Sequence, residues 1–201
     1  ATESTFSSEV WINHICQHEK IKVLFWQSPG YFKLEDFIHT ITTKSMYPRS
    51  TTFTDHCFSI EEENILRSQL KEFSEKIKKE ITSYLNWFES EFRESPSNLP
   101  YMRYKDTISI GAALTQGILT YNPNSHFQID EQYVRLVMDL CQRMVCGIEL
   151  LKYIQQQYSV HSLILSEHVY QASVLIEFAK LNNIKCPRLA DAIHCKTPSS
   201  L

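Results

Sequence analysis

Apolar residues recur at spacings of three and four over one long stretch of this sequence, and this periodicity constrains the fold more than any other feature. The residues that share the spacing are Leu66, Leu70, Phe73, Ile77, Ile81, Tyr84, Phe88 and Phe92. Such a repeat puts all of them on one face of an α-helix, so that face should be buried. Ser59 and Glu62 form a capping-box signature at its start, and Pro96 and Pro100 mark its end. The sequence therefore predicts a helix over residues 59–95.

A second periodic stretch begins after Asp130, a residue type that favours the N-cap position of a helix. Apolar residues between Tyr133 and Ile154 again follow helical spacing, which predicts a helix over residues 130–157. A shorter helix is expected within residues 104–121.

Short apolar runs predict strands at residues 21–26, 160–165 and 184–187, and a helical pattern at 169–181 separates the last two. A strand, a helix and a second strand in this order form a parallel, right-handed unit. The predicted fold class is therefore α/β, with a Rossmann-like parallel sheet and several long helices. Residues 45–100 are a candidate helical insertion in this fold.

Composition excludes some classes of function. The net charge of −3 gives no general attraction to nucleic acid, and no apolar run reaches the roughly 20 residues of a membrane span. The six cysteines include no CxxC pair, so we expect free thiols and a cytoplasmic location.

Phosphate and metal sites are also not expected. The chain has only four glycines and no glycine-rich phosphate motif, so this segment should not hold the phosphates of a nucleotide. His14, Cys16 and His18 are close in sequence, but no second ligand pair at zinc spacing follows them. No metal is predicted.

Polar residues gather where the strand 160–165 should end, at the edge where open α/β sheets bind ligands. His168 or Glu167 could take a proton from a substrate hydroxyl, while Tyr170 and Ser166 could bind the substrate. Alternatively, Ser166 or Glu167 caps the following helix, and His168 and Tyr170 pack against neighbours.

The loop after the first predicted strand should reach the same edge of the sheet. It contains Ser28, Gly30 and Tyr31 as candidate substrate-binding residues, since Gly30 permits close approach and Tyr31 offers a ring for stacking. The alternative is that Pro29 and Gly30 only form a turn.

The segments ISIGAALTQGILTY and LILSEHVYQASVLIEFAKLNNIKC resemble the N-terminal half of GT-B-like glycosyltransferases of capsule and surface polysaccharide biosynthesis. The resemblance implies that residues 1–201 are a single Rossmann-like acceptor-side domain, truncated at its C-terminus, with a missing C-terminal donor-binding domain. It also implies a nucleotide-sugar donor and a glycan or small-molecule acceptor, with no cofactor in this segment. Whether Glu167 or His168 is the active residue stays open.

Two classes of function follow. The first is sugar transfer from a nucleotide-sugar to a polysaccharide or glycan acceptor. The second is a non-catalytic, helix-rich interaction module in which the two long helices bind a partner. A second apolar stripe on the exposed faces of these helices would favour the module, and the sequence places mostly Glu, Lys, Gln and Ser there.

Overall fold

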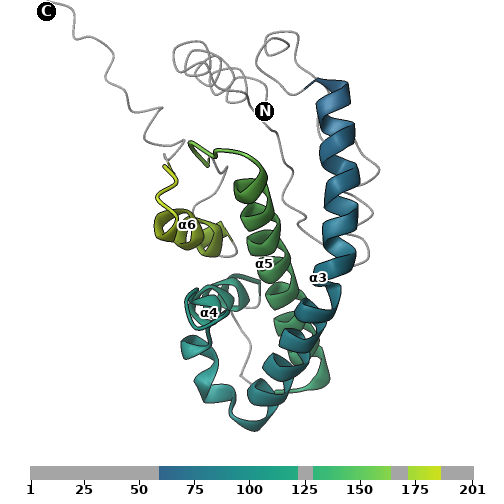
Figure 1. The fold of residues 1–201 in the computed structure, drawn as a ribbon. Helices are drawn as coiled ribbons and strands as arrows, with labels where there is room; N and C mark the ends of the chain where they lie inside the picture. The colour runs from purple at the N-terminus through teal and green to yellow at the C-terminus, as the bar shows by residue number, and fades with distance from the viewer. Residues whose placement is uncertain (1–58, 122–128, 164–171, 187–201) are drawn as a thin grey trace, which may run out of the picture.

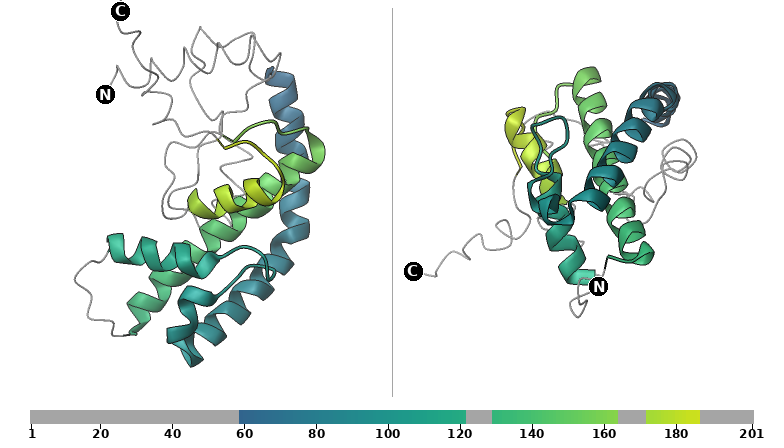
Figure 2. Two further views of the ribbon diagram at one scale, coloured as in Figure 1. Left: turned by 90° about the vertical axis from the view of Figure 1, so that its left-hand side faces the viewer. Right: turned by 90° about the horizontal axis from the view of Figure 1, so that it is seen from below.

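The computed structural model describes residues 59–121, 129–163 and 172–186 (Figure 1). The elements in chain order are α3 (Ile60–Glu94), the 3-10 helix η1 (Pro96–Tyr101), α4 (Ile110–Tyr121), α5 (Glu131–Gln157) and α6 (Ala172–Leu181). The central helix is α5, which has α3 on one side and α4 and α6 on the other (Figures 1 and 2).

The start and end of α3 are fixed by local chemistry, as predicted. The Ser59 hydroxyl accepts a hydrogen bond from the Glu62 amide at 3.1 Å, and the Glu62 carboxylate accepts one from the Ser59 amide at 2.8 Å. The helix ends at Glu94, because Pro96 disfavours helical backbone angles in the preceding Ser95. The predicted capping box is confirmed.

The apolar face of α3 packs on the core along most of its length. Six of its periodic residues are buried, and the remaining two are partly buried and packed against the same cluster. The buried residues are Leu66, Leu70, Ile77, Ile81, Phe88 and Phe92, and the partly buried ones are Phe73 and Tyr84. The helix lies within the candidate insertion 45–100, and it shares one hydrophobic cluster with α4, α5 and α6.

The central helix α5 starts at the predicted cap, where the Tyr133 amide donates to the Asp130 carboxylate at 2.8 Å. It runs antiparallel to α3, since Arg93 pairs with Glu131 at one end and Phe73 stacks on Tyr153 at the other. Every residue from 144 to 151 is buried, because neighbouring helices cover this part of α5 on both sides.

Glycine allows close contact between elements at the start of α4. A Cβ atom on Gly111 would lie 1.7 Å from the carbonyl oxygen of Leu99, so only glycine fits against η1 there. The Gly111 amide also donates to the Met102 carbonyl at 2.9 Å. Glycine at this position therefore fixes α4 directly against the 3-10 helix.

The predicted Rossmann-like parallel sheet is wrong for the residues that the structure describes. Of these residues 79% are helical, and none belongs to a strand. Around the predicted strands 160–165 and 184–187 the described chain makes one isolated parallel bridge, between Ser162 and Lys185. The apolar character of Val160 and Leu163, which suggested a strand, is accounted for by their packing on the helical core. Residues 164, 165 and 187 of these predicted strands lie outside the described residues. The predicted strand 21–26 lies outside the described residues.

None of the helices within the three described ranges is both long enough and apolar enough to cross a lipid bilayer.

Candidate functional site

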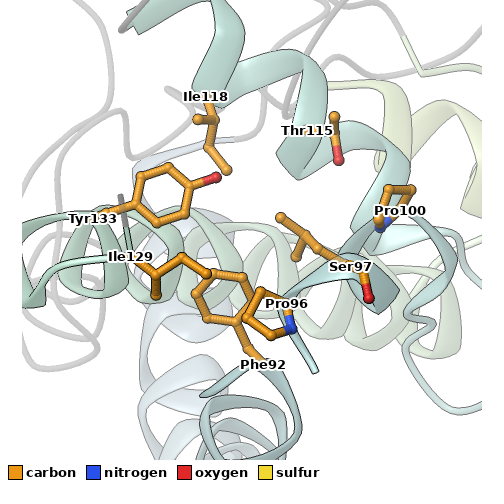
Figure 3. Close-up of a pocket in the computed structure, with 9 residues that line it drawn as sticks. Phe92, Pro96, Ser97, Pro100, Thr115, Ile118, Ile129 and Tyr133 are labelled. Carbon is orange, nitrogen blue, oxygen red and sulfur yellow. The ribbon is translucent and has the colours of Figure 1, made fainter. Parts of the chain in front are cut away.

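An apolar pocket lies at the end of the bundle where α3 ends and α5 begins (Figure 3). We call it the end pocket. Its volume is ≈ 320 Å³. Its lining residues come from four segments that are separated in sequence: Phe92, Pro96, Ser97, Leu99, Pro100, Thr115, Ile118, Ile129 and Tyr133.

The residues that form each wall of the end pocket can be explained by a feature of the nearby sequence. Phe92 is the last buried residue of the α3 stripe, and its ring lies 6.0 Å from the ring of Tyr133 in the first turn of α5. Pro96 and Pro100 form the η1 wall, since proline is compatible with the turn that follows α3. The opposite wall is α4, which contributes Ile118. Because Gly111 has no side chain, η1 and α4 can pack directly against each other.

Three hydroxyl groups are the polar side-chain atoms of this lining, and they belong to Ser97, Thr115 and Tyr133 (Figure 3). The Thr115 hydroxyl donates to the Gly111 carbonyl at 2.9 Å. Burial raises the pKa of Tyr133, so its phenol stays protonated at neutral pH. Among the nine described lining residues there is no carboxylic acid, no basic side chain and no thiol, so this lining is suited to an apolar group.

Large apolar side chains are exposed at Ile129, which lines the pocket, and at Tyr101 and Leu119, which directly follow the lining residues Pro100 and Ile118 in the sequence. Tyr101 is 80% exposed, Leu119 47% and Ile129 46%, although each has a large apolar side chain. Neither η1 nor α4 contains a charged residue. Large exposed apolar groups beside an apolar pocket are typical of a binding surface.

Charged residues border this surface on the side of α3 and α5. The guanidinium of Arg93 donates two hydrogen bonds to Glu131, at 2.8 and 3.0 Å, and one to Glu89 at 2.9 Å. The hydrogen bonds from Arg93 lower the pKa of Glu131. These contacts tie the end of α3 to the start of α5 at the edge of the end pocket.

A charged cluster around the buried Glu149 includes Tyr104 and Lys105 from the loop that joins η1 to α4. Glu149 is 2% exposed, and its carboxylate accepts a hydrogen bond from the Tyr104 hydroxyl at 2.8 Å and from Lys105 Nζ at 2.9 Å. Lys105 also pairs with Glu80 at 2.6 Å, and Lys152 lies 3.6 Å from the second Glu149 oxygen. We call these five residues the Glu149 cluster.

The Glu149 cluster is a structural tie between elements. Burial acts to lower the pKa of Lys105, but its hydrogen bonds with Glu80 and Glu149 outweigh this effect and raise it. Burial, and then the charge of Glu149, raise the pKa of Tyr104. The carboxylate thus has a partner for each oxygen, and the cluster connects α3, α5 and the loop.

A histidine and a serine meet beside the parallel bridge. His161 Nδ1 lies 2.8 Å from the Ser162 hydroxyl, and His161 Nε2 lies 3.3 Å from Lys185 Nζ. A lysine ammonium can only donate, so Nε2 accepts and the neutral ring carries its proton on Nδ1. In that tautomer Nδ1 donates to the Ser162 hydroxyl and does not accept its proton.

The predicted site residues lie outside the described residues. These are His168, Glu167, Tyr170, Ser166, Ser28, Gly30 and Tyr31. In contrast, the sequence analysis missed the end pocket. The signal that could have found it is the absence of charge throughout residues 110–121 beside a segment with two prolines.

Comparison with known families, curated proteins and solved structures finds no match. The similarity to glycosyltransferases therefore stays a prediction. Within the described ranges, no group of three or more His, Cys, Asp or Glu side chains is placed to hold a metal ion.

Proposed function

We propose that this chain is a non-catalytic, helix-rich interaction module that binds an apolar side chain of a partner protein in the end pocket. The observation that carries the proposal is the pocket itself, ≈ 320 Å³ in volume, with its lining residue Ile129 46% exposed and Tyr101, next to the lining residue Pro100 in the sequence, 80% exposed. Burying exposed apolar surface of this kind is the main driving force of protein association.

The distribution of exposed apolar residues supports the pocket as the binding site, in preference to a long helix face. On α3 the large exposed apolar residues are Ile60, Ile65 and Trp87, whose spacings do not form a stripe. The described part of the chain has no large exposed apolar residue on α5. In contrast, three such residues from three different segments either line the end pocket, as Ile129 does, or directly follow a lining residue in the sequence, as Tyr101 and Leu119 do.

Selection of peptides tests this proposal on the 201-residue chain. A library of displayed peptides of about twelve residues is panned against the protein, and selected peptides are measured by fluorescence anisotropy. We expect Ser97→Trp to weaken binding at least about tenfold, because Ser97 lines the pocket and is exposed, so an indole can fill the space. The matched control is Ser68→Trp on the exposed face of α3, about 36 Å along the helix from Phe92. Equal binding to both variants would show that the end pocket is not the site.

We propose sugar transfer as a second candidate, because one observation favours it. Residues 161–163 pair in parallel with Lys185 on the two sides of α6, and ligand sites often lie beside such a connection. Here Glu167 or His168 would deprotonate a hydroxyl of a glycan or small-molecule acceptor. The acceptor would be bound by Tyr170, Ser166, Ser28, Gly30 and Tyr31.

Sugar transfer is tested by calorimetry and by turnover. The chain alone should not bind UDP- or GDP-sugars at micromolar concentrations, because it has no glycine-rich phosphate motif. If transfer is measured with a donor domain present, His168→Ala should lower turnover about a hundredfold. A variant with lower melting temperature and normal turnover would point to helix capping instead.

We further propose a cytoplasmic location. Cys141 and Cys146 are free thiols in the core, and burial raises the pKa of Cys141, which keeps it protonated. Free thiols are typical of proteins in reducing compartments.

A further inference from the structure

The uncharged surface around the end pocket has an acidic border. Residues 89–94 and 130–135 contain five carboxylates and two guanidinium groups. Glu94 ends α3 two residues before Pro96, and Asp130 follows Ile129, so both lie next to lining residues in the sequence. We call residues 89–94 and 130–135 the acidic border.

The guanidinium of Arg93 in the acidic border is already paired. Arg93 binds both Glu89 and Glu131 through three hydrogen bonds. Because one guanidinium is shared by two carboxylates, this group of three keeps a net negative charge. A partner that covers the end pocket therefore meets negative potential on the side of α3 and α5.

We propose that the occupant of the end pocket is a basic amphipathic helix of another protein, an inference that rests on the proposed function. One large apolar side chain of the helix enters the pocket, and a second contacts Leu119 or Tyr101 on the uncharged surface. Lysine or arginine residues on its flank face the acidic border. Helices commonly dock into grooves through apolar residues three or four positions apart, and complementary charge then fixes their orientation.

The same charges argue against two other occupants. A second copy of this chain would bring another acidic border to the interface, where like charges repel. An anionic membrane would be repelled in the same way. A basic helix both buries the apolar surface and neutralises the border.

The inference is tested with two synthetic helical peptides on the full 201-residue chain. Both carry leucine at the same positions, three and four residues apart, and they differ only in having lysine or glutamate on the flank. By fluorescence anisotropy at low salt, the lysine peptide should bind at least about tenfold more tightly. The preference should shrink at an ionic strength of about 0.5 M, because salt screens exposed charges.

Variants of the protein test whether the acidic border causes the preference for lysine, and they separate the basic-helix proposal from the pocket proposal. Glu94→Lys should weaken the lysine peptide several-fold, whereas Glu75→Lys, the same change on an exposed residue of α3 far from the pocket, should not. Equal affinity for both peptides, with Ser97→Trp still blocking them, would overturn the basic partner and leave the pocket as the site. Failure of Ser97→Trp to weaken the lysine peptide, or no binding of either peptide, would overturn both proposals. Pocket-dependent binding to phosphatidylcholine vesicles would instead identify a lipid surface as the occupant.

Discussion

The Glu149 cluster includes Tyr104 and Lys105 from the connection 102–109, and the end pocket is lined by η1 and α4, the two elements that this connection joins. The two regions differ in how they treat charged and apolar side chains. In the cluster, the carboxylate of Glu149 is buried, and both of its oxygens have partners. At the pocket, apolar side chains such as Tyr101 and Ile129 remain in contact with water. The carboxylate of Glu149 thus finds its partners among the described residues, whereas the exposed apolar side chains at the pocket would be stabilised further if a partner buried them.

This difference indicates which region holds the fold together and which is open to a partner. Buried charge without partners is costly, so a fully paired cluster is explained by stability alone. Exposed apolar surface next to a pocket has no comparable explanation within the described residues. Lys105 and Asp106 support this view, because both adopt left-handed backbone angles with φ of 49° and 58°, which the surrounding contacts of the loop must hold in place.

The largest effect on the pocket side is expected from Gly111→Ala. The added Cβ would meet a backbone oxygen at 1.7 Å, and neither η1 nor α4 can move without disturbing the other. We expect the free energy of unfolding to fall by more than about 3 kcal/mol. Chemical denaturation measures it.

Gly117→Ala is the matched control on the same helix. Its Cβ would lie 3.6 Å from a methyl carbon of Leu140, an ordinary contact, and alanine favours helix over glycine by about 1 kcal/mol. This variant should therefore be neutral or slightly stabilised. If both variants behave alike, contact between η1 and α4 is not what requires glycine.

On the cluster side, Glu149→Ala should give the next largest effect. It removes the partner of the buried Tyr104 hydroxyl and one partner of Lys105. A buried hydroxyl left without its acceptor costs about 1–3 kcal/mol, and the space left by the buried side chain adds to this loss. Lys152→Ala is the control, since Lys152 is 3.6 Å from the carboxylate and 40% exposed, and it should cost less than about 1 kcal/mol. A comparable loss in both variants would contradict the central place of Glu149.

Alkaline pH should also destabilise the cluster. Burial raises the pKa of Tyr84 and of Tyr104 above the ordinary value near 10. Their protonated forms stabilise the folded state fully below about pH 10, and this contribution is lost as the pH rises toward the folded-state values. Tyr104→Phe should reduce the loss of stability between about pH 9 and 12, measured by circular dichroism with denaturant. Tyr101→Phe, on the exposed ring, should leave that pH dependence unchanged, and a change there would contradict the assignment to buried phenols.

The helical part of the fold was predictable, because its signals are local. Ser59 and Glu62 are three residues apart, and the α3 stripe repeats within one element. The sheet prediction failed because a short apolar run such as 160–165 indicates burial without indicating what covers it. Here the helical core covers Val160 and Leu163.

The end pocket was harder to predict, because it depends on contacts between distant segments. Phe92 and Tyr133 meet only when α3 and α5 align in antiparallel fashion, and that register cannot be read from either helix alone. Gly111 looked like an ordinary helix residue, since its role depends on Leu99 lying directly beneath it. The predicted corner at Glu167 and His168 stays a prediction.

The smallest effect, and the sharpest test of the contrast between buried and exposed charge, is expected from Glu80→Gln. Glu80 pairs with Lys105 at 2.6 Å, as Glu149 also does, but its side chain is 55% exposed. The hydrogen bond from Lys105 lowers the pKa of Glu80, so its stabilising contribution is present above about pH 4.5 and is lost as the pH falls below that value. Water screens this pair, so the variant should lose only a few tenths of a kcal/mol at neutral pH, and its stability should depend less on pH in the acid range.

Denaturation of the wild-type protein and of Glu80→Gln at neutral and acid pH measures both quantities, with Glu75→Gln as a control for removing a charge from the same helix. A loss as large as that of Glu149→Ala would mean that the exposed pair Glu80–Lys105 stabilises the fold as much as the buried carboxylate of Glu149 does. The burial of a charged residue in the cluster would then not determine its contribution to stability.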